Sequence, residues 1–172
     1  MRRPGWRGAL VFLALTIITV ANFTLRDDGK SAPTLASTFT VGDPMPPLKI
    51  RPLTSGGASA AALAPAGCHV VVVFASSCKH CHIAAARAKL RQSDRNLPTI
   101  WVSHTDDEAA LAFERDLGDA GVVAYGGPEV FRKLKVNAVP TAFLVTPARR
   151  VARVWVYTGE EDPAELEAAC VP

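Results

Sequence analysis

The sequence is poor in cysteine and methionine, with four of the former and two of the latter among its 172 residues. Four cysteines are too few for a small scaffold held together by disulfides, and the 12 glycines are not spaced as in collagen. Hydrophobic residues make up 49% and charged residues 20%, a composition that excludes intrinsic disorder. The chain is therefore globular, with the length of one domain or slightly more.

Positive charge is missing from the part of the chain that is expected to fold. Four of the 19 basic residues lie within residues 1–26, which contain no acidic residue, and this leaves 15 basic against 16 acidic residues in 27–172. The resulting formal charge of −1 argues against a nucleic-acid-binding domain, because such a domain keeps its basic residues on the folded surface. We therefore predict no nucleic-acid partner.

An uncharged apolar segment at residues 8–25 follows a basic tail at residues 1–7. As a helix its 18 residues span roughly 27 Å, close to the ~30 Å hydrocarbon core of a bilayer. The positive-inside rule predicts that the tail is cytoplasmic and that the chain beyond Arg26 lies on the periplasmic side of the inner membrane. A cleaved signal peptide, leaving the domain soluble in the periplasm or secreted, is the alternative, but Thr19-Val20-Ala21 is a poor cleavage site. Either way the domain reaches a compartment where disulfides persist.

Residues 26–40 are polar and small and show no helical or strand period, so we predict a linker there and a folded domain over residues 41–172. Within this domain apolar runs and amphipathic segments alternate. They predict strands at 47–53, 69–75, 97–103, 121–125, 140–146 and 150–157, and helices at 79–91, 106–117, 128–135 and 161–170. This order predicts an α/β fold with a central mixed sheet that is covered by helices.

Two of these segments carry predictions about their faces. In the helix at 79–91 the apolar residues Ile83, Ala86 and Leu90 recur at the spacing of one helical face. In the strand at 150–157 alternation places Ala152, Val154 and Val156 on one face, and Arg153, Trp155 and Tyr157 on the other.

A C-x-x-C motif, Cys78-Lys79-His80-Cys81, lies where the β-branched run 69–75 gives way to the helix. In this context the motif is typical of a redox-active cysteine pair. Cys78 falls at the helix N-terminus, where unpaired N–H groups and the helix dipole favour a thiolate, the form that attacks disulfides. Since Lys79 and His80 add potential positive charge, we expect a pKa for Cys78 below about 7.

The segment FASSCKHC, followed by Val139-Pro140-Thr141 and a terminal hairpin and helix, resembles the thioredoxin fold. With the N-terminal apolar segment, the start at Val41-Gly42-Asp43-Pro44 and the stretch VPTAFLVTP, the chain is similar to membrane-tethered periplasmic thiol–disulfide oxidoreductases of the TlpA/ResA type over residues 41–170. The resemblance implies that Pro140 is cis and faces the C-x-x-C motif. It also implies that Val139 and Pro140 bind the substrate backbone.

The chain departs from this family's pattern at three places. Ser77 stands before the first cysteine, where the family usually has Trp, and Val72 stands where many thioredoxins have a buried acid. The pair Lys79-His80 replaces the proline-containing pair common in reductants, and a histidine before the second cysteine is reminiscent of the oxidant DsbA group. The direction of electron flow therefore stays open.

Other classes of protein also fit the motif. Cys78, Cys81 and His82 match C-x-x-C-H, the attachment signature of c-type haem, although both methionines, Met1 and Met45, lie upstream of it. A copper or zinc module that uses Cys78, Cys81 and His80 or His82 is a further alternative, although residues so close together make only a partial tetrahedral shell. A purely structural disulfide between the two cysteines is the simplest alternative of all.

The remaining cysteines carry a hypothesis that follows from the expected fold. Cys68 precedes the strand that leads to Cys78, and Cys170 ends the last helix, so both fall at the end of the sheet remote from the motif. We therefore predict a structural Cys68–Cys170 disulfide, worth on the order of 4–5 kcal/mol in the chain-entropy model.

Together these residues predict an extracytoplasmic thiol–disulfide oxidoreductase. Cys78 and Cys81 are the predicted catalytic residues, and no cofactor and no metal site are predicted. The expected partners are protein dithiols or disulfides and a redox partner in the membrane. The resemblance implies a role in cytochrome c biogenesis or in the repair of extracytoplasmic thiols.

Overall fold

The computed structural model of the chain describes residues 37–53, 65–91 and 97–170. The predicted basic tail at 1–7, the predicted span at 8–25 and residues 26–36 of the predicted linker lie outside these residues. No helix of the described ranges is long and apolar enough to cross a membrane.

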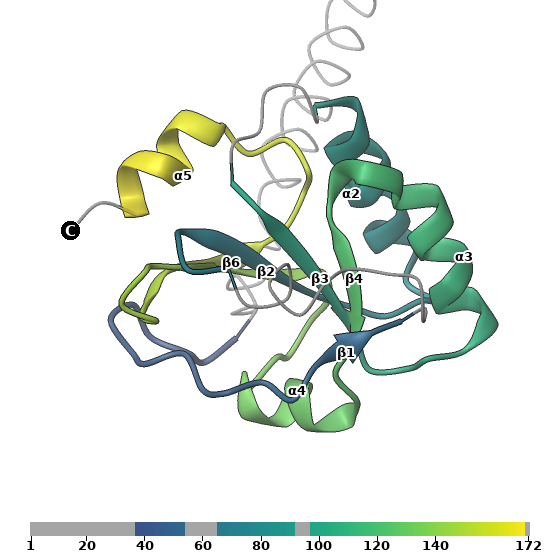
Figure 1. Cartoon of the computed structure of the whole chain (residues 1–172), viewed down its shortest axis with the longest axis horizontal. Coiled ribbons are helices and arrows are strands. Elements are labelled where there is room, and N and C mark those ends of the chain that lie inside the picture. Colours follow the sequence, from purple (N-terminus) through teal and green to yellow (C-terminus); the bar gives the residue numbers. More distant parts are fainter. Residues whose placement is uncertain (1–36, 54–64, 92–96, 171–172) are drawn as a thin grey trace, which may run out of the picture. The chain divides into compact units, whose positions relative to one another are not determined.

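Six strands form one mixed sheet in the order β1-β4-β3-β2-β5-β6 (Figure 1). In chain order they are β1 (Arg51–Pro52), β2 (His69–Phe74), β3 (Thr99–Ser103), β4 (Val122–Tyr125), β5 (Thr141–Val145) and β6 (Val151–Val156). The central strand β2 pairs in parallel with β3 and antiparallel with β5. β4 continues the parallel part of the sheet, whereas the edge strands β1 and β6 are antiparallel to their neighbours. The strand positions predicted from the sequence agree with these strands.

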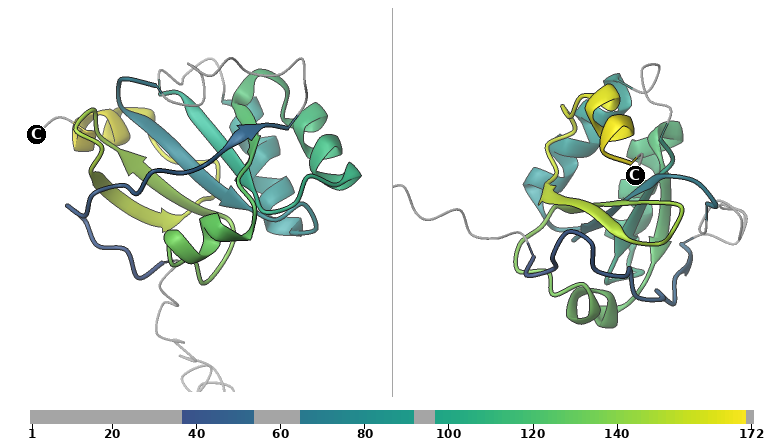
Figure 2. Two further views of the ribbon diagram at one scale, coloured as in Figure 1. Left: turned by 60° about the horizontal axis from the view of Figure 1, so that its bottom comes forward. Right: turned by 90° about the vertical axis from the view of Figure 1, so that its left-hand side faces the viewer.

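Helices cover both faces of the sheet (Figures 1 and 2). They are α2 (Lys79–Leu90), α3 (Glu108–Leu117) with the short 3-10 helix η2 (Gly118–Ala120), α4 (Pro128–Lys133) and α5 (Pro163–Cys170). The first apolar cluster contains buried side chains of α2, α3 and α5, and the second contains Val130 of α4 together with Met45 from the segment before β1. The predicted α/β fold with a central mixed sheet and flanking helices is confirmed.

Strand β2 shows why a continuous β-branched run belongs in the middle of this sheet. Successive side chains of a strand point to opposite faces. Accordingly Val70, Val72 and Phe74 join the first cluster, whereas Val71 and Val73 join the second. The ring of Phe74 stacks on Phe113 of α3 at 4.1 Å between centroids, so the strand is fixed against a helix just before the C-x-x-C motif.

The helix predicted at 79–91 is confirmed, but the apolar residues whose spacing indicated it lie on its exposed side. Ile83 is 39% exposed, Leu90 is 85% exposed, and Ala86 is also exposed. The buried residues of α2 are Cys81, Ala84, Ala85 and Ala88, which share the opposite side at the same helical spacing. These small side chains allow the helix to lie close to the sheet, and they bring Cys81 inside the first cluster.

The alternation predicted for the strand at 150–157 is wrong at one position. The pairing register of β5 and β6 shifts between Leu144 and Val145, so one extra residue is inserted in β6. Val154 packs against the second cluster as predicted from the alternation, but Ala152 packs against the first cluster, on the side of Trp155. The position of such a bulge cannot be predicted from the alternation of apolar and polar residues in the sequence.

Candidate active site

The candidate site lies where β2 leaves the sheet and α2 begins. After buried Phe74 the chain makes a turn in which the Cys78 N–H donates to the Ala75 carbonyl at 3.0 Å. Ser76 within this turn is buried, and its Oγ lies 3.2 Å from Oγ1 of Thr105, which follows β3. The turn is thus held to the neighbouring strand, and this contact fixes where the helix starts.

Cys78 is the N-cap residue of α2. Its backbone is extended, and its Sγ accepts the Cys81 N–H at 3.2 Å. An N-cap side chain in this position satisfies a helix N–H that has no partner within the helix. The first turn of α2 contains no acidic residue, so the partial positive charge of the helix N-terminus remains available to this sulfur.

The two cysteines of the motif differ in exposure and are joined by a disulfide. Cys78 is half-buried, whereas Cys81 is 0% exposed and belongs to the first apolar cluster. An incoming sulfur therefore reaches Cys78 first, and Cys81 is placed to attack only within the protein.

The segment before β5 lies beside the first cysteine. Cys78 Sγ is 3.7 Å from the Val139 carbonyl oxygen, and the Val139–Pro140 peptide bond is cis. Pro140 is buried, and its carbonyl accepts the Tyr157 N–H at 3.0 Å. The structure therefore brings together Cys78, Cys81, Val139 and Pro140, the four residues that the sequence and its family resemblance combined.

Lys79 and His80 occupy the first turn of α2, and both are exposed. Both side chains lie in solvent near the motif, where salt screens the effect of a charge on the sulfur. The effect of the two residues on Cys78 stays a prediction.

His82 is the residue of this region whose position the sequence did not indicate. Its Nε2–H donates to the Ser76 carbonyl at 2.8 Å, and its ring packs edge-on against Phe113 at 5.2 Å between centroids. This nitrogen is therefore engaged in holding the turn before Cys78. The haem alternative would require the His82 ring to leave both contacts. No sequence spacing links residues 76 and 82 across the start of a helix, so only the fold reveals the bond.

The position that often holds a buried acid in thioredoxins is apolar here. Val72 is fully buried, and no Asp or Glu is among the buried side chains of the described ranges. Those ranges also contain no group of three or more His, Cys, Asp or Glu side chains placed to hold a metal ion. The surroundings of Cys81 are therefore aliphatic and aromatic.

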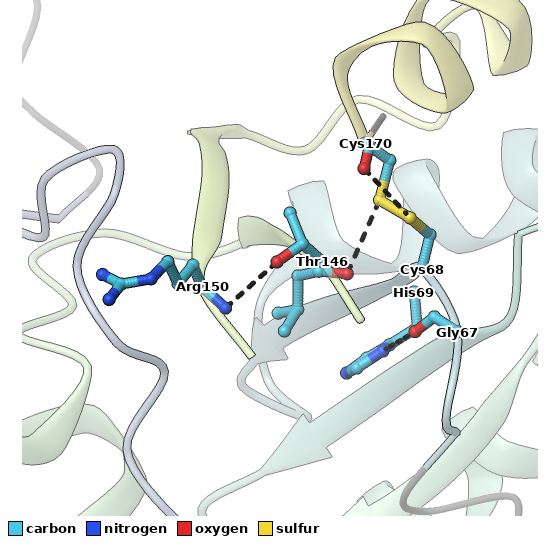
Figure 3. Close-up of a disulfide and its surroundings, with 7 residues drawn as sticks. Gly67, Cys68, His69, Thr146, Arg150 and Cys170 are labelled. Carbon is cyan, nitrogen blue, oxygen red and sulfur yellow. Dashed lines mark hydrogen bonds between the residues drawn. A yellow bond between two sulfur atoms is a disulfide. The ribbon is translucent and has the colours of Figure 1, made fainter. Parts of the chain in front are cut away.

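The second pair of cysteines is also linked. A disulfide joins Cys68, just before β2, to Cys170, the last residue of α5 (Figure 3). Cys170 is 3% exposed, and its Sγ lies 3.7 Å from the Val145 carbonyl oxygen at the end of β5. The pair lies at the end of the sheet remote from Cys78, where the sequence placed it.

Solved structures resemble this geometry. A thiol-disulfide isomerase from Corynebacterium glutamicum superposes with a TM-score of 0.58 at 20% identity, over 75% of this chain and 97% of that one. A Chlorobium tepidum protein assigned as the thiol:disulfide interchange protein DsbE gives a TM-score of 0.60 at 19% identity, over 77% and 96%. A secreted Mycobacterium tuberculosis disulfide oxidoreductase gives 0.50 at 11% identity, over 60% and 82%. The chain has a thioredoxin fold.

The thioredoxin fold places the C-x-x-C motif and the Val139–Pro140 bond at the same end of the neighbouring strands β2 and β5. No protein-family model and no curated protein sequence matches the chain. At the identities given above, the likeness to solved structures establishes the fold, and the activity has to be argued from the site.

Proposed function

We propose that this protein is an extracytoplasmic thiol–disulfide oxidoreductase of the TlpA/ResA type that works through Cys78 and Cys81. One observation carries the proposal: Cys78 is half-exposed at the N-terminus of α2, and its Sγ accepts the Cys81 N–H. This environment favours a thiolate, which is the attacking form in disulfide exchange. The activities named for the structural neighbours support the same chemistry.

In the reducing direction the reaction has two steps. The Cys78 thiolate attacks one sulfur of the substrate disulfide, a new S–S bond forms, and the other substrate sulfur leaves as a thiolate with the electron pair. Cys81 then attacks Cys78 Sγ, the protein disulfide forms, and the first substrate sulfur leaves with the Cys81 proton. Two electrons pass from the cysteine pair to the substrate, and oxidation of a dithiol is the reverse sequence.

The buried position of Cys81 fits the second step. Because Cys81 is 0% exposed and Cys78 is half-buried, the mixed disulfide forms on Cys78 and is resolved from inside. The backbone of Val139, next to Cys78 Sγ, binds the substrate chain in this proposal, and Pro140 holds that segment in place. Lys79 and His80 stabilise the Cys78 thiolate from the solvent side.

Two cysteine variants test the activity. Cys78→Ser should abolish the reduction of insulin disulfides, because no attacking sulfur remains. Cys81→Ser should instead accumulate mixed disulfides with substrate proteins, detectable on non-reducing gels and lost on reduction. The double variant Cys68→Ala/Cys170→Ala is the matched control and should retain activity. If the Cys78 and Cys81 variants both stay active, the assignment is wrong.

The direction of electron flow follows from the redox potential of the Cys78–Cys81 pair. A potential of about −270 mV, as in thioredoxin, would make the protein a reductant. A potential of about −120 mV, as in DsbA, would make it an oxidant. Equilibration with glutathione buffers, followed by thiol trapping, measures this potential.

The location and partners belong to the same proposal. Residues 8–25 anchor the protein in the inner membrane with residues 1–7 in the cytoplasm, and a membrane redox partner exchanges electrons with Cys78. The substrates are protein dithiols or disulfides, in cytochrome c maturation or in the repair of extracytoplasmic thiols. The full chain should be found in the membrane fraction. Protease added to intact spheroplasts should digest its domain, because the domain lies outside the inner membrane. A domain that resists digestion until lysis contradicts the location.

A further inference from the structure

A cavity of about 390 Å³ lies at the end of the sheet remote from Cys78. Its floor is formed by Val71, Ile100 and Val145 on three neighbouring strands of the sheet, and Met45, Leu48 and Ile50 from the segment before β1 line it as well. The volume falls within the range of small-molecule sites, about 300–1,000 Å³. The cavity shares no lining residue with the candidate active site, so it is separate from that site.

The cavity has a polar side with two basic residues. His69, the first residue of β2, and Arg149, in the turn between β5 and β6, both line it, and among the lining residues of the described ranges there is no Asp or Glu. The His69 Nδ1–H donates to the Gly67 carbonyl at 2.9 Å (Figure 3). The neutral ring then has no N–H left for a ligand, because Nε2 carries only a lone pair.

The backbone of Arg149 is held on both sides. Its N–H donates to the Thr146 carbonyl at 2.9 Å, and its carbonyl accepts the Met45 N–H at 2.8 Å. These bonds join the turn to the segment that lines the cavity, so the backbone from which the Arg149 side chain extends is fixed. No ion pair joins Arg149 to an acidic residue of the part of the chain that the structure describes.

The positive charge at this wall is that of Arg149, and it favours an anion, whereas His69 favours its neutral form. Burial and the positive charge of Arg149 both lower the pKa of His69, with burial the larger cause. A carboxylate bound at the wall would interact favourably with the guanidinium and accept a charge-assisted hydrogen bond from it. An apolar tail on the same molecule would cover the aliphatic floor and leave water.

We propose that this cavity binds a small aliphatic carboxylate, with its carboxylate at Arg149 and its hydrocarbon tail on Val71, Ile100 and Val145. The positive charge of Arg149 favours the carboxylate of such a molecule, and the apolar floor favours its hydrocarbon tail. The site is independent of the cysteine pair at the other end of β2, so the proposal does not rest on the redox function.

Equilibrium dialysis with radiolabelled octanoate tests the proposal on the full oxidised chain in a nonionic detergent, with protein-free micelles as the blank. We expect saturable binding of one octanoate. Acetate should bind at least about a hundredfold more weakly, because the buried CH2 groups of the tail are missing. Octanol should bind about tenfold more weakly, because it lacks the charge.

Two neighbouring arginines provide a matched pair of variants. Arg149→Gln should lower the affinity for octanoate about tenfold and leave the affinity for octanol unchanged. Arg150→Gln removes the same charge from a residue that does not line the cavity and whose Nη1 donates to the Gly42 carbonyl, and it should change neither affinity by more than about twofold. The proposal is overturned if octanoate does not saturate, if octanol binds as tightly as octanoate, or if the two variants behave alike.

Discussion

The two disulfides lie at opposite ends of β2 and at opposite ends of their helices. Cys78 begins α2, and its sulfur accepts a backbone N–H, with one carbonyl oxygen, that of Val139, beside it. Cys170 ends α5, and the sulfurs of the second pair lie 3.6–3.7 Å from the carbonyl oxygens of Cys170 and Val145. A helix carries partial positive charge at its N-terminus and partial negative charge at its C-terminus.

This difference predicts one reactive and one inert pair without a large difference in burial. Each pair contains one buried and one half-buried cysteine. A thiolate is stabilised by N–H groups at Cys78 and opposed by carbonyl groups at Cys170, so exchange is favoured only at the first. We therefore expect the end of the helix, more than the exposure of the sulfur, to decide which cysteine pair performs exchange.

Removing the second disulfide should have the largest effect on stability. It closes a loop with a sequence separation of 102 residues, and such a loop contributes about 4–5 kcal/mol in the chain-entropy model. The double variant Cys68→Ala/Cys170→Ala should lose this amount in urea unfolding while insulin reduction persists where the variant is folded. A loss of stability below about 1 kcal/mol would show that the second disulfide is not a structural one.

Alkylation of the fully reduced protein sharpens the comparison of the two sulfur environments. With iodoacetamide at mildly acidic pH, Cys78 should react on the order of a hundredfold faster than Cys68, which is also half-buried but whose sulfur lies beside the Cys170 carbonyl oxygen, because only Cys78 is stabilised as a thiolate. Timed quenching followed by peptide mass spectrometry gives both rates from one sample. Equal rates would contradict the argument from the helix ends.

The contact of His82 with the turn before Cys78 should have a smaller effect. His82→Phe keeps an aromatic ring against Phe113 but leaves the buried Ser76 carbonyl without its donor, at a cost of about 1–3 kcal/mol. The matched variant His80→Phe changes an exposed ring two residues earlier and should leave the unfolding free energy unchanged. Equal stability of the two variants in urea unfolding would mean that the Ser76 bond contributes nothing.

The pH dependence contributed by His69 should be the smallest effect. Its pKa in the folded protein lies below the ordinary value of 6.5, chiefly because of burial. As the pH falls below about 6.5 the unfolded chain takes up this proton before the folded protein does, so stability decreases, whereas above 6.5 the residue contributes no slope. His69→Gln should reduce the slope of unfolding free energy against pH between about 6.5 and 5. An unchanged slope would refute the assignment.

The fold and the two cysteine pairs were predictable because their signals are local or follow from topology. A β-branched run, a C-x-x-C motif and a Val-Pro-Thr segment each lie within a few residues of sequence, and the ends of parallel and antiparallel strands then place Cys68 near Cys170. The buried face of α2 was not predictable from Ile83 and Leu90, because the side of the helix that packs on the sheet carries small residues instead. His82, the bulge in β6 and the cavity depend on contacts between segments far apart in the sequence.

The long span of the second disulfide has a consequence for how a damaged molecule behaves. A protease that cuts the backbone once, anywhere between Cys68 and Cys170, produces two chains that the bond still joins. A nicked molecule should therefore run as one band on a denaturing gel and separate into two only after a reductant is added. Samples judged intact without reductant can contain cleaved protein.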